Sequence, residues 1–307
     1  MGISKDVLSV IGSTPVVLLN KIKGDCPAKI IGKLEMLNPG GSIKARTAWG
    51  MVFDAEKKGL IKSGSTIVEP TSGNQGVGLA MVGAVRGYRV IIVMPDSMSK
   101  ERRQLVKAFG GEVVLTPGNE DIGGAIKKAR ELVNSIDGAW MPDQFGNPAN
   151  PAFHEQTTAR EILSQLDCPV HAFVVGVGTG GTLSGVTRVL KTKHPEMQVY
   201  AVEPENSAVI SGSPPGTHGI QGIGDGFVPK NLDLSLVDAT FRVTDEQAME
   251  MARRLAKEEG LLAGISSGAA VYAAVQVGRK LGAGKTVLTI LPDTGERYLS
   301  LNLYSSN

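Results

Sequence analysis

The sequence predicts an α/β protein built on mostly parallel sheets, and three observations lead to that prediction. Short apolar, β-branched runs alternate with longer helical patterns along the 307 residues, which is the order expected of parallel α/β architecture. The runs are apolar almost throughout, as in VIIVM at 90–94, which is typical of strands covered on both faces. Many of the 39 glycines stand where these runs end, at points where a backbone turns tightly or approaches a ligand.

The elements follow each other in regular alternation. We expect strands at 29–34, 66–69, 89–94, 112–115, 172–175, 198–202 and 286–291. We expect helices at 45–58, 74–86, 100–109, 122–135, 151–166, 182–193, 245–259 and 267–281. The segment GNPANPAF at 146–153 is rich in proline and turn residues and marks a domain boundary, while 204–231 is a long Gly/Pro/Ser-rich stretch of the kind that is functional or mobile.

Composition excludes several classes of protein. A net charge of +2 with scattered basic residues argues against nucleic-acid binding, which needs a clustered basic patch. No apolar run approaches the roughly 20 residues that span a bilayer, so no membrane segment is expected. Two cysteines far apart indicate neither a disulfide framework nor a zinc site and favour a reducing, cytoplasmic location. The four histidines show no metal-ligand spacing, so no metal is expected.

A glycine-rich turn after the strand at 172–175 is the first candidate site. The stretch GVGTGGT would expose backbone N–H groups and threonine hydroxyls at a helix N-terminus, where a phosphate binds; its residues are Gly178, Thr179, Gly180, Gly181 and Thr182. Two alternatives stay open. Either the glycines serve only tight packing, or Gly176-x-Gly178-x-x-Gly181 with Glu203 about 20 residues on forms a dinucleotide fingerprint.

Two further segments supply other functional groups. PTSGN at 70–74 places Thr71, Ser72 and Asn74 at a helix start, which suits a carboxylate or is an ordinary N-cap cluster. Lys44, in NPGGSIKAR, is either a solvated helix-start residue or a buried amine with a chemical task. An amine, a phosphate cup and a carboxylate site together point to an aldehyde-bearing phosphate cofactor.

These motifs resemble the cysteine synthase (O-acetylserine sulfhydrylase) and cystathionine β-synthase family, which are fold type II pyridoxal-phosphate enzymes. The resemblance runs from IGSTPVV at 11–17 to LPDTGERYLS at 291–300, and the matching segments stand in family order: NPGGSIKAR, EPTSGN, MPDQFGNPANP, GVGTGGTLSG, GIQGIG and GISSGAA. It implies two open, twisted, mostly parallel sheets flanked by helices, with the active site in the cleft between two domains. We expect a larger cofactor-anchoring domain of residues 1–40 and 150–307, and a smaller, mobile substrate-carboxylate domain of residues 41–149.

The resemblance also implies the role of each site residue. Lys44 matches the Schiff-base lysine, Asn74 the amide on the ring oxygen of pyridoxal 5'-phosphate, and Ser266 the serine facing the pyridine nitrogen. The residues Gly178 to Thr182 match the phosphate loop. The residues that match the substrate site are Thr71, Ser72, Gly73, Asn74, Gln144 and Gly222.

The implied reaction is β-replacement on a serine-type amino acid through an α-aminoacrylate intermediate, with Lys44 as general base. O-acetylserine and sulfide would give cysteine and acetate. The implied partners are the amino acid, a sulfide or thiol, a second copy of the chain in a homodimer, and the tail of a serine acetyltransferase.

Three positions depart from the family pattern. Ala45 and Gln75 stand where many relatives carry an acidic residue and a threonine, and Asp225 stands where the sulfhydrylases carry a small apolar residue. As a second catalytic group, Asp225 would protonate a hydroxyl or thiol leaving group. The enzyme would then use serine or cysteine and produce hydrogen sulfide, lanthionine or cystathionine-type products. Alternatively, Asp225 is a turn former among glycines.

Two other functions fit the motifs less well. A serine or threonine dehydratase on the same fold is disfavoured by the matching GVGTGG and GERYLS motifs. A non-catalytic nucleotide-binding module leaves Lys44, PTSGN and GISSG without a role.

Overall fold

The computed structural model describes residues 2–301, 303 and 304, which form two compact units. The smaller unit comprises the chain up to Ile11 together with Asn38–Asn150, and the larger comprises Gly12–Leu37 with Pro151–Asn307. The expected division placed residues 1–40 in the larger domain, whereas in the structure the first residues up to Ile11 group with the smaller unit. One reason is Leu8, which is buried in the same hydrophobic cluster as the helices of the smaller unit.

The larger unit is built on a six-stranded sheet with the order β1-β2-β9-β6-β7-β8. Its strands are β1 (Val16–Leu18), β2 (Lys29–Leu34), β6 (Ala172–Gly176), β7 (Gln198–Pro204), β8 (Ala239–Val243) and β9 (Thr286–Leu291). Only β1 runs antiparallel to its neighbour; the other pairs are parallel, with Ile30 opposite Val287 in the pair β2–β9. The edge strands are harder to find in the sequence, because β1 has only three residues and β8 is interrupted by Thr240 and Arg242.

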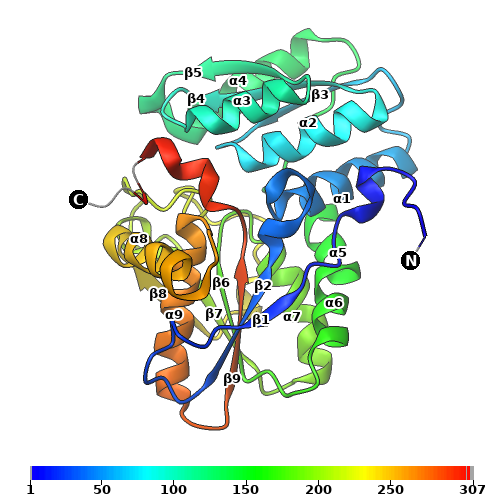
Figure 1. Ribbon diagram of the computed structural model, residues 1–307. Helices are drawn as coiled ribbons and strands as arrows, with labels where there is room; N and C mark the ends of the chain where they lie inside the picture. Colours follow the sequence, from blue (N-terminus) through cyan, green and yellow to red (C-terminus); the bar gives the residue numbers. More distant parts are fainter. Residues whose placement is uncertain (1, 302, 305–307) are drawn as a thin grey trace. The chain divides into compact units, whose positions relative to one another are not determined.

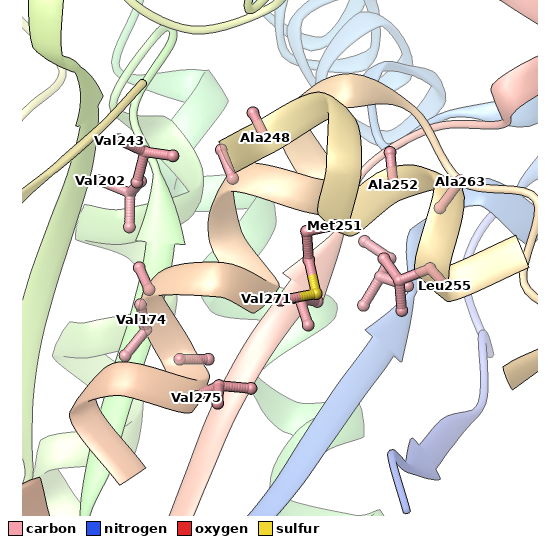
Figure 2. Close-up of a cluster of buried hydrophobic side chains, with 14 of the residues drawn as sticks. Val174, Val202, Val243, Ala248, Met251, Ala252, Leu255, Ala263, Val271 and Val275 are labelled. Carbon is pink, nitrogen blue, oxygen red and sulfur yellow. The ribbon is translucent and has the colours of Figure 1, made fainter. Parts of the chain in front are cut away.

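Helices cover both faces of this sheet. In Figure 1, α8 (Asp245–Arg254) and α9 (Ile265–Leu281) lie on one side, and α6 (Thr158–Gln165) and α7 (Gly181–Lys193) on the other. The predicted helix at 151–166 is two helices, α5 (Ala149–Gln156) and α6, because Thr157 leaves helical geometry at φ −121°. Figure 2 shows the core between α8, α9 and the sheet, where Val174, Val202 and Val243 meet Met251 and Val271.

The smaller unit has a three-stranded parallel sheet of order β3-β4-β5. Its elements are β3 (Thr66–Pro70), β4 (Arg89–Pro95), β5 (Glu112–Thr116), α1 (Lys44–Lys57), α2 (Asn74–Arg86), α3 (Lys100–Ala108) and α4 (Asp121–Ser135). Ile67 and Ile92 pack with residues of α1 and α2, while Val68 and Ile91 pack with α4. Both faces are therefore buried, as continuous apolar strands predict.

The predicted α/β class with mostly parallel sheets is confirmed. Within the described part of the chain, no helix is both long and apolar enough to cross a membrane.

Candidate functional site

Lys44 is the first residue of α1 and follows a tight turn. Gly40 and Gly41 in that turn have φ values of +73° and +69°, which residues with a Cβ rarely adopt. The backbone N–H of Lys44 donates to the Ser42 hydroxyl at 3.3 Å. On the other side, Gly78 of α2 packs so closely that a Cβ there would lie 2.8 Å from the Lys44 carbonyl oxygen. The backbone of Lys44 is thus held on both sides, and its side chain is half-buried.

The PTSGN segment links β3 to α2 and is shaped by Gly73. This residue has φ +142°, and a Cβ there would lie 2.1 Å from Cδ of Arg102, so only glycine fits. The backbone N–H of Gly73 donates to the buried Thr71 hydroxyl at 3.0 Å. Asn74 is the first residue of α2, where backbone N–H groups and the helix dipole favour an anion.

Glu69 and Gln144 lie beside the same segment. Glu69 accepts hydrogen bonds from the backbone N–H groups of Gln144 at 3.0 Å and Asp143 at 3.1 Å. The Gln144 side chain donates from Nε2 to the Pro70 carbonyl at 3.2 Å. The predicted carboxylate-binding residues Thr71, Ser72 and Gln144 therefore gather at the carboxyl end of β3, where ligands bind in parallel sheets.

Sequence reasoning gave Glu69 no role, although it is the one acidic residue in the run TIVEP. It is fully buried, and burial raises the pKa of its carboxyl from 4.5 to about 8. An acidic residue at the end of an apolar, buried strand is the sequence signal that could have identified Glu69 as important.

The predicted phosphate loop connects β6 to the N-terminus of α7 in the larger unit. Gly180 has φ +79°, and a Cβ there would lie 2.6 Å from the backbone nitrogen of Leu232. A Cβ on Gly178 would lie 2.4 Å from the Gly222 carbonyl oxygen. These glycines are required by close approach of neighbouring loops, and α7 presents its N-terminal N–H groups at the same place.

His154 contacts this loop through a side-chain hydrogen bond, which the sequence did not predict. Its ring is 1% exposed. Nε2 lies 3.3 Å from the Thr182 hydroxyl, and Nδ1 lies 2.9 Å from the Thr158 hydroxyl. The contacts join residues far apart in sequence, so no local pattern reveals them.

The loop at 219–227 brings the remaining predicted residues together. A Cβ on Gly222, whose φ is +99°, would lie 3.9 Å from the Ser266 hydroxyl oxygen. A Cβ on Gly178 would lie 3.8 Å from a carboxyl oxygen of Asp225. The larger unit therefore places the phosphate loop, Gly222, Asp225 and Ser266 at one location.

His218 shapes this loop through both ring nitrogens. Nε2 lies 2.8 Å from the Gly224 carbonyl, and Nδ1 accepts from the backbone N–H of Ile220 at 3.2 Å.

Glu203 argues against the dinucleotide alternative. Its buried carboxylate accepts hydrogen bonds from the backbone N–H groups of Ile210 at 2.8 Å and Ser211 at 3.1 Å. These bonds anchor the long loop after β7, so the carboxylate is already engaged where a ribose hydroxyl would need it.

Comparison with known proteins places this architecture in a family. The model of the family described as pyridoxal-phosphate dependent enzymes matches residues 7–293. The chain belongs to this family. It is 55% identical to a cysteine synthase of Staphylococcus aureus over 98% of this chain and 97% of the relative.

Solved structures of the same family superpose closely. The structure of an O-ureido-L-serine synthase matches with a TM-score of 0.96 and 45% identity, covering 99% of this chain and 96% of the other. A hydrogen sulfide-producing enzyme from Fusobacterium nucleatum matches with a TM-score of 0.93 and 42% identity, covering 96% of this chain and all of the other.

Pyridoxal phosphate is the cofactor of this family, and the larger unit fits its requirements. The turn at 178–182 is free of side chains where loops approach closely, as a backbone phosphate cradle needs. Ser266, the second residue of α9 and 3% exposed, offers a neutral hydroxyl for a ring nitrogen. Among the described residues, no group of His, Cys, Asp and Glu side chains is arranged to hold a metal ion.

Proposed function

We propose that this protein catalyses β-replacement on a serine-type amino acid, as a cysteine synthase that converts O-acetylserine and sulfide to cysteine and acetate. The observation that carries this proposal is the 55% identity to a cysteine synthase across nearly the whole chain. The expected sites support it, because the glycine cradle and the carboxylate loop each have the local geometry that their role requires.

Lys44 is the proposed catalytic residue. Pyridoxal phosphate, when bound, supplies an electron sink that makes the α-proton of the amino acid acidic. The Lys44 amine attaches the cofactor at rest, takes the α-proton and later returns it. The backbone of Lys44 is held on both sides, which limits the positions that its amine can reach.

Thr71, Ser72, Asn74 and Gln144 are the proposed residues for orienting the amino acid. The N-terminal turn of α2 offers N–H groups and a favourable dipole to the substrate carboxylate. Gln144 is 3% exposed, and its bond to the Pro70 carbonyl keeps its side chain beside the PTSGN segment. Gly73 supplies the backbone shape that no other residue permits.

A second candidate is favoured by the position of Asp225. Its carboxyl lies in the larger unit beside Gly178, the first residue of the phosphate loop. From there it would donate a proton to a departing hydroxyl or thiol. The enzyme would then use serine or cysteine and form cystathionine, lanthionine or hydrogen sulfide.

The two candidates are separated by supplying O-acetylserine, O-phosphoserine, serine and cysteine in turn and measuring the products. Turnover of O-acetylserine with sulfide, equal in the wild type and in Asp225→Ala, supports the cysteine synthase. Turnover of serine or cysteine that Asp225→Ala abolishes and the exposed control Asp167→Ala retains supports the second candidate. No turnover of any of the four contradicts both.

The assembly and location of the enzyme also belong to this proposal. We expect a homodimer, a cytoplasmic location and recognition of the C-terminal tail of a serine acetyltransferase. Two free cysteines, Cys26 and Cys168, are consistent with a reducing compartment. Sedimentation of the purified protein alone, and then with the tail peptide, tests the first and third expectations.

A further inference from the structure

The turn that leads into α9 is paired with the segment that follows β9. The backbone N–H of Gly264, the residue directly before α9, donates to the carbonyl oxygen of Asp293 at 3.0 Å. The neighbouring residues Ala263 and Thr294 form an antiparallel bridge. Because Ser266 is the second residue of α9, this pairing ends two residues before the serine that is expected to face the ring nitrogen of the cofactor.

Two tyrosine hydroxyl groups complete the contact between these segments. Tyr298 is fully buried, and its hydroxyl donates to Oδ2 of Asp293 at 2.7 Å. The hydroxyl of Tyr304 donates to the carbonyl oxygen of Ala263. Burial raises the pKa of Tyr304 to about 12, so this hydroxyl keeps its proton and remains a donor at neutral pH. The segment that follows β9 therefore holds the turn through its backbone and through two side chains.

The packing around Gly264 couples the turn to the first turn of α9. A Cβ on Gly264 would overlap Oδ1 of Asp293 and would lie 2.6 Å from Cε2 of Tyr298, so the turn has little room to move. The carbonyl oxygen of Gly264 accepts hydrogen bonds from the backbone N–H groups of Ser267 at 3.0 Å and Gly268 at 3.2 Å. A displacement of Gly264 would therefore be passed directly to the helical turn that contains the expected cofactor contact.

Ser266 needs such support if its hydroxyl is to meet a ring nitrogen. Its side chain is buried and faces the loop at 219–227, since a Cβ on Gly222 would lie 3.9 Å from its hydroxyl oxygen. A hydrogen bond from a hydroxyl weakens steeply when its length or direction changes. Groups that contact a ligand must be held within about 0.5 Å by the residues around them. The turn before α9 is the part of the described structure that can supply this constraint on Ser266.

We propose that Asp293, Tyr298 and Tyr304 are positioning residues that fix the hydroxyl of Ser266 where it meets the ring nitrogen of pyridoxal phosphate. The three residues act through the turn before α9, and the proposal requires no contact between them and the cofactor. This inference rests on the proposed function through the expected role of Ser266. It gives the motif LPDTGERYLS a role in the cofactor site beyond that of a scaffold.

The test is a double-mutant cycle in the holoenzyme with Tyr298→Phe and Ser266→Ala, because phenylalanine keeps the ring of Tyr298 and removes only its hydroxyl. Each single substitution is expected to speed the loss of visible cofactor absorbance on dialysis about three- to tenfold, as when one hydrogen bond is lost. Each is also expected to shift the absorbance maximum in the same direction. In the double variant, Tyr298→Phe is expected to add no further change to that of Ser266→Ala.

Full additivity of the two effects would overturn the inference, because Tyr298 would then act independently of Ser266. A second variant, Tyr304→Phe, leaves the bond between Tyr298 and Asp293 in place. It is expected to change both readouts in the same direction and also to add nothing in the Ser266→Ala background. If Tyr298→Phe does not fold, the cycle with Tyr304→Phe decides the question by the same criterion.

Two controls separate positioning from a general loss of stability. Thr244→Ala removes the side chain that caps α8, which is expected to lower the melting temperature and to leave both cofactor readouts unchanged. Tyr272→Phe removes a hydroxyl from α9 itself, where the ring of Tyr272 packs against Phe241, and should also change neither readout. If Thr244→Ala loses its cofactor as fast as Tyr298→Phe, general destabilisation explains the effect and the inference is overturned.

The outcomes also separate this inference from the proposed function. The cycle is measured without substrate, whereas the proposed function fails if the wild type turns over none of the four amino acids. If Ser266→Ala changes neither readout, the expected role of Ser266 fails and the inference fails with it. If Ser266→Ala changes both readouts while Tyr298→Phe and Tyr304→Phe change neither, only the positioning role is overturned.

Discussion

The carboxyl group of Glu69 accepts a hydrogen bond from the backbone N–H of Gln144 at 3.0 Å. A second bond from the backbone N–H of Asp143 completes the contact, and Asp143 has an uncommon positive φ of 54°. The turn that carries Gln144 is thus fastened to the last residues of β3, from which the PTSGN segment begins. A buried acid that sequence reasoning overlooked holds two predicted substrate-binding segments together.

The raised pKa of Glu69 predicts how stability depends on pH. The unfolded carboxyl releases its proton near pH 4.5, whereas burial holds the folded pKa at about 8. Between these values the folded state binds the extra proton, so the contribution of Glu69 to stability is complete below pH 4.5 and is lost as the pH rises through 8. The free energy of unfolding is expected to fall with a slope of up to about 1.4 kcal/mol per pH unit from this group.

Urea unfolding at several pH values, compared between the wild type and Glu69→Gln, measures this effect. The glutamine does not titrate, so the free energy of unfolding of the wild type should fall relative to that of Glu69→Gln as the pH rises from 4.5 toward 8. The exposed control Glu196→Gln should follow the wild type. A constant difference across this range would show that Glu69 is ionised in the folded protein.

The contact between His154 and the phosphate loop predicts that His154 is needed to retain the cofactor. Replacing it by alanine removes the contacts to Thr182 and Thr158, which costs about 1–3 kcal/mol when a buried partner is left unpaired. The His154→Ala protein is expected to lose its visible cofactor absorbance on dialysis faster than the wild type. His194→Ala, at the end of α7, is the control and should retain the cofactor. Reduced stability with unchanged retention would limit His154 to a scaffold role.

The close packing at Gly178 predicts that a single added methyl group disturbs the phosphate loop. The Cβ of Gly178→Ala would lie 2.4 Å from a backbone carbonyl oxygen, so one of the two loops must move. We expect weak cofactor binding and loss of about 1–3 kcal/mol of stability. Gly123→Ala in α4 meets no atom within 4 Å and should stabilise the helix by about 0.5–1 kcal/mol. Fluorescence titration with pyridoxal phosphate and thermal unfolding distinguish the two, and unaltered binding in Gly178→Ala would contradict a cradle at this turn.

The sequence predicted the fold well where burial is complete. The strands β2, β4, β6, β7 and β9 are buried at all residues or at all but one, and the apolar residues at their centres stand out locally. The edge strand β1 has only three residues and β8 is interrupted by polar residues, so both become recognisable only through their pairing with β2 and β7.

The candidate site was predictable only where a local motif carries it. Lys44, the PTSGN segment and the phosphate loop owe their shape to nearby glycines, which the sequence displays directly. Glu69 and His154 owe their importance to burial and to residues distant in sequence. Such contacts depend on the packed fold, so no spacing rule reveals them.

The central claim is that Lys44 carries the cofactor, and one measurement tests it most directly. The purified holoenzyme is reduced with borohydride, digested and analysed by mass spectrometry. The account predicts that the reduced pyridoxyl group is found on the peptide containing Lys44, and that Lys44→Ala shows no such modification. Modification of a different lysine, such as the buried Lys33, or of none, would contradict the account.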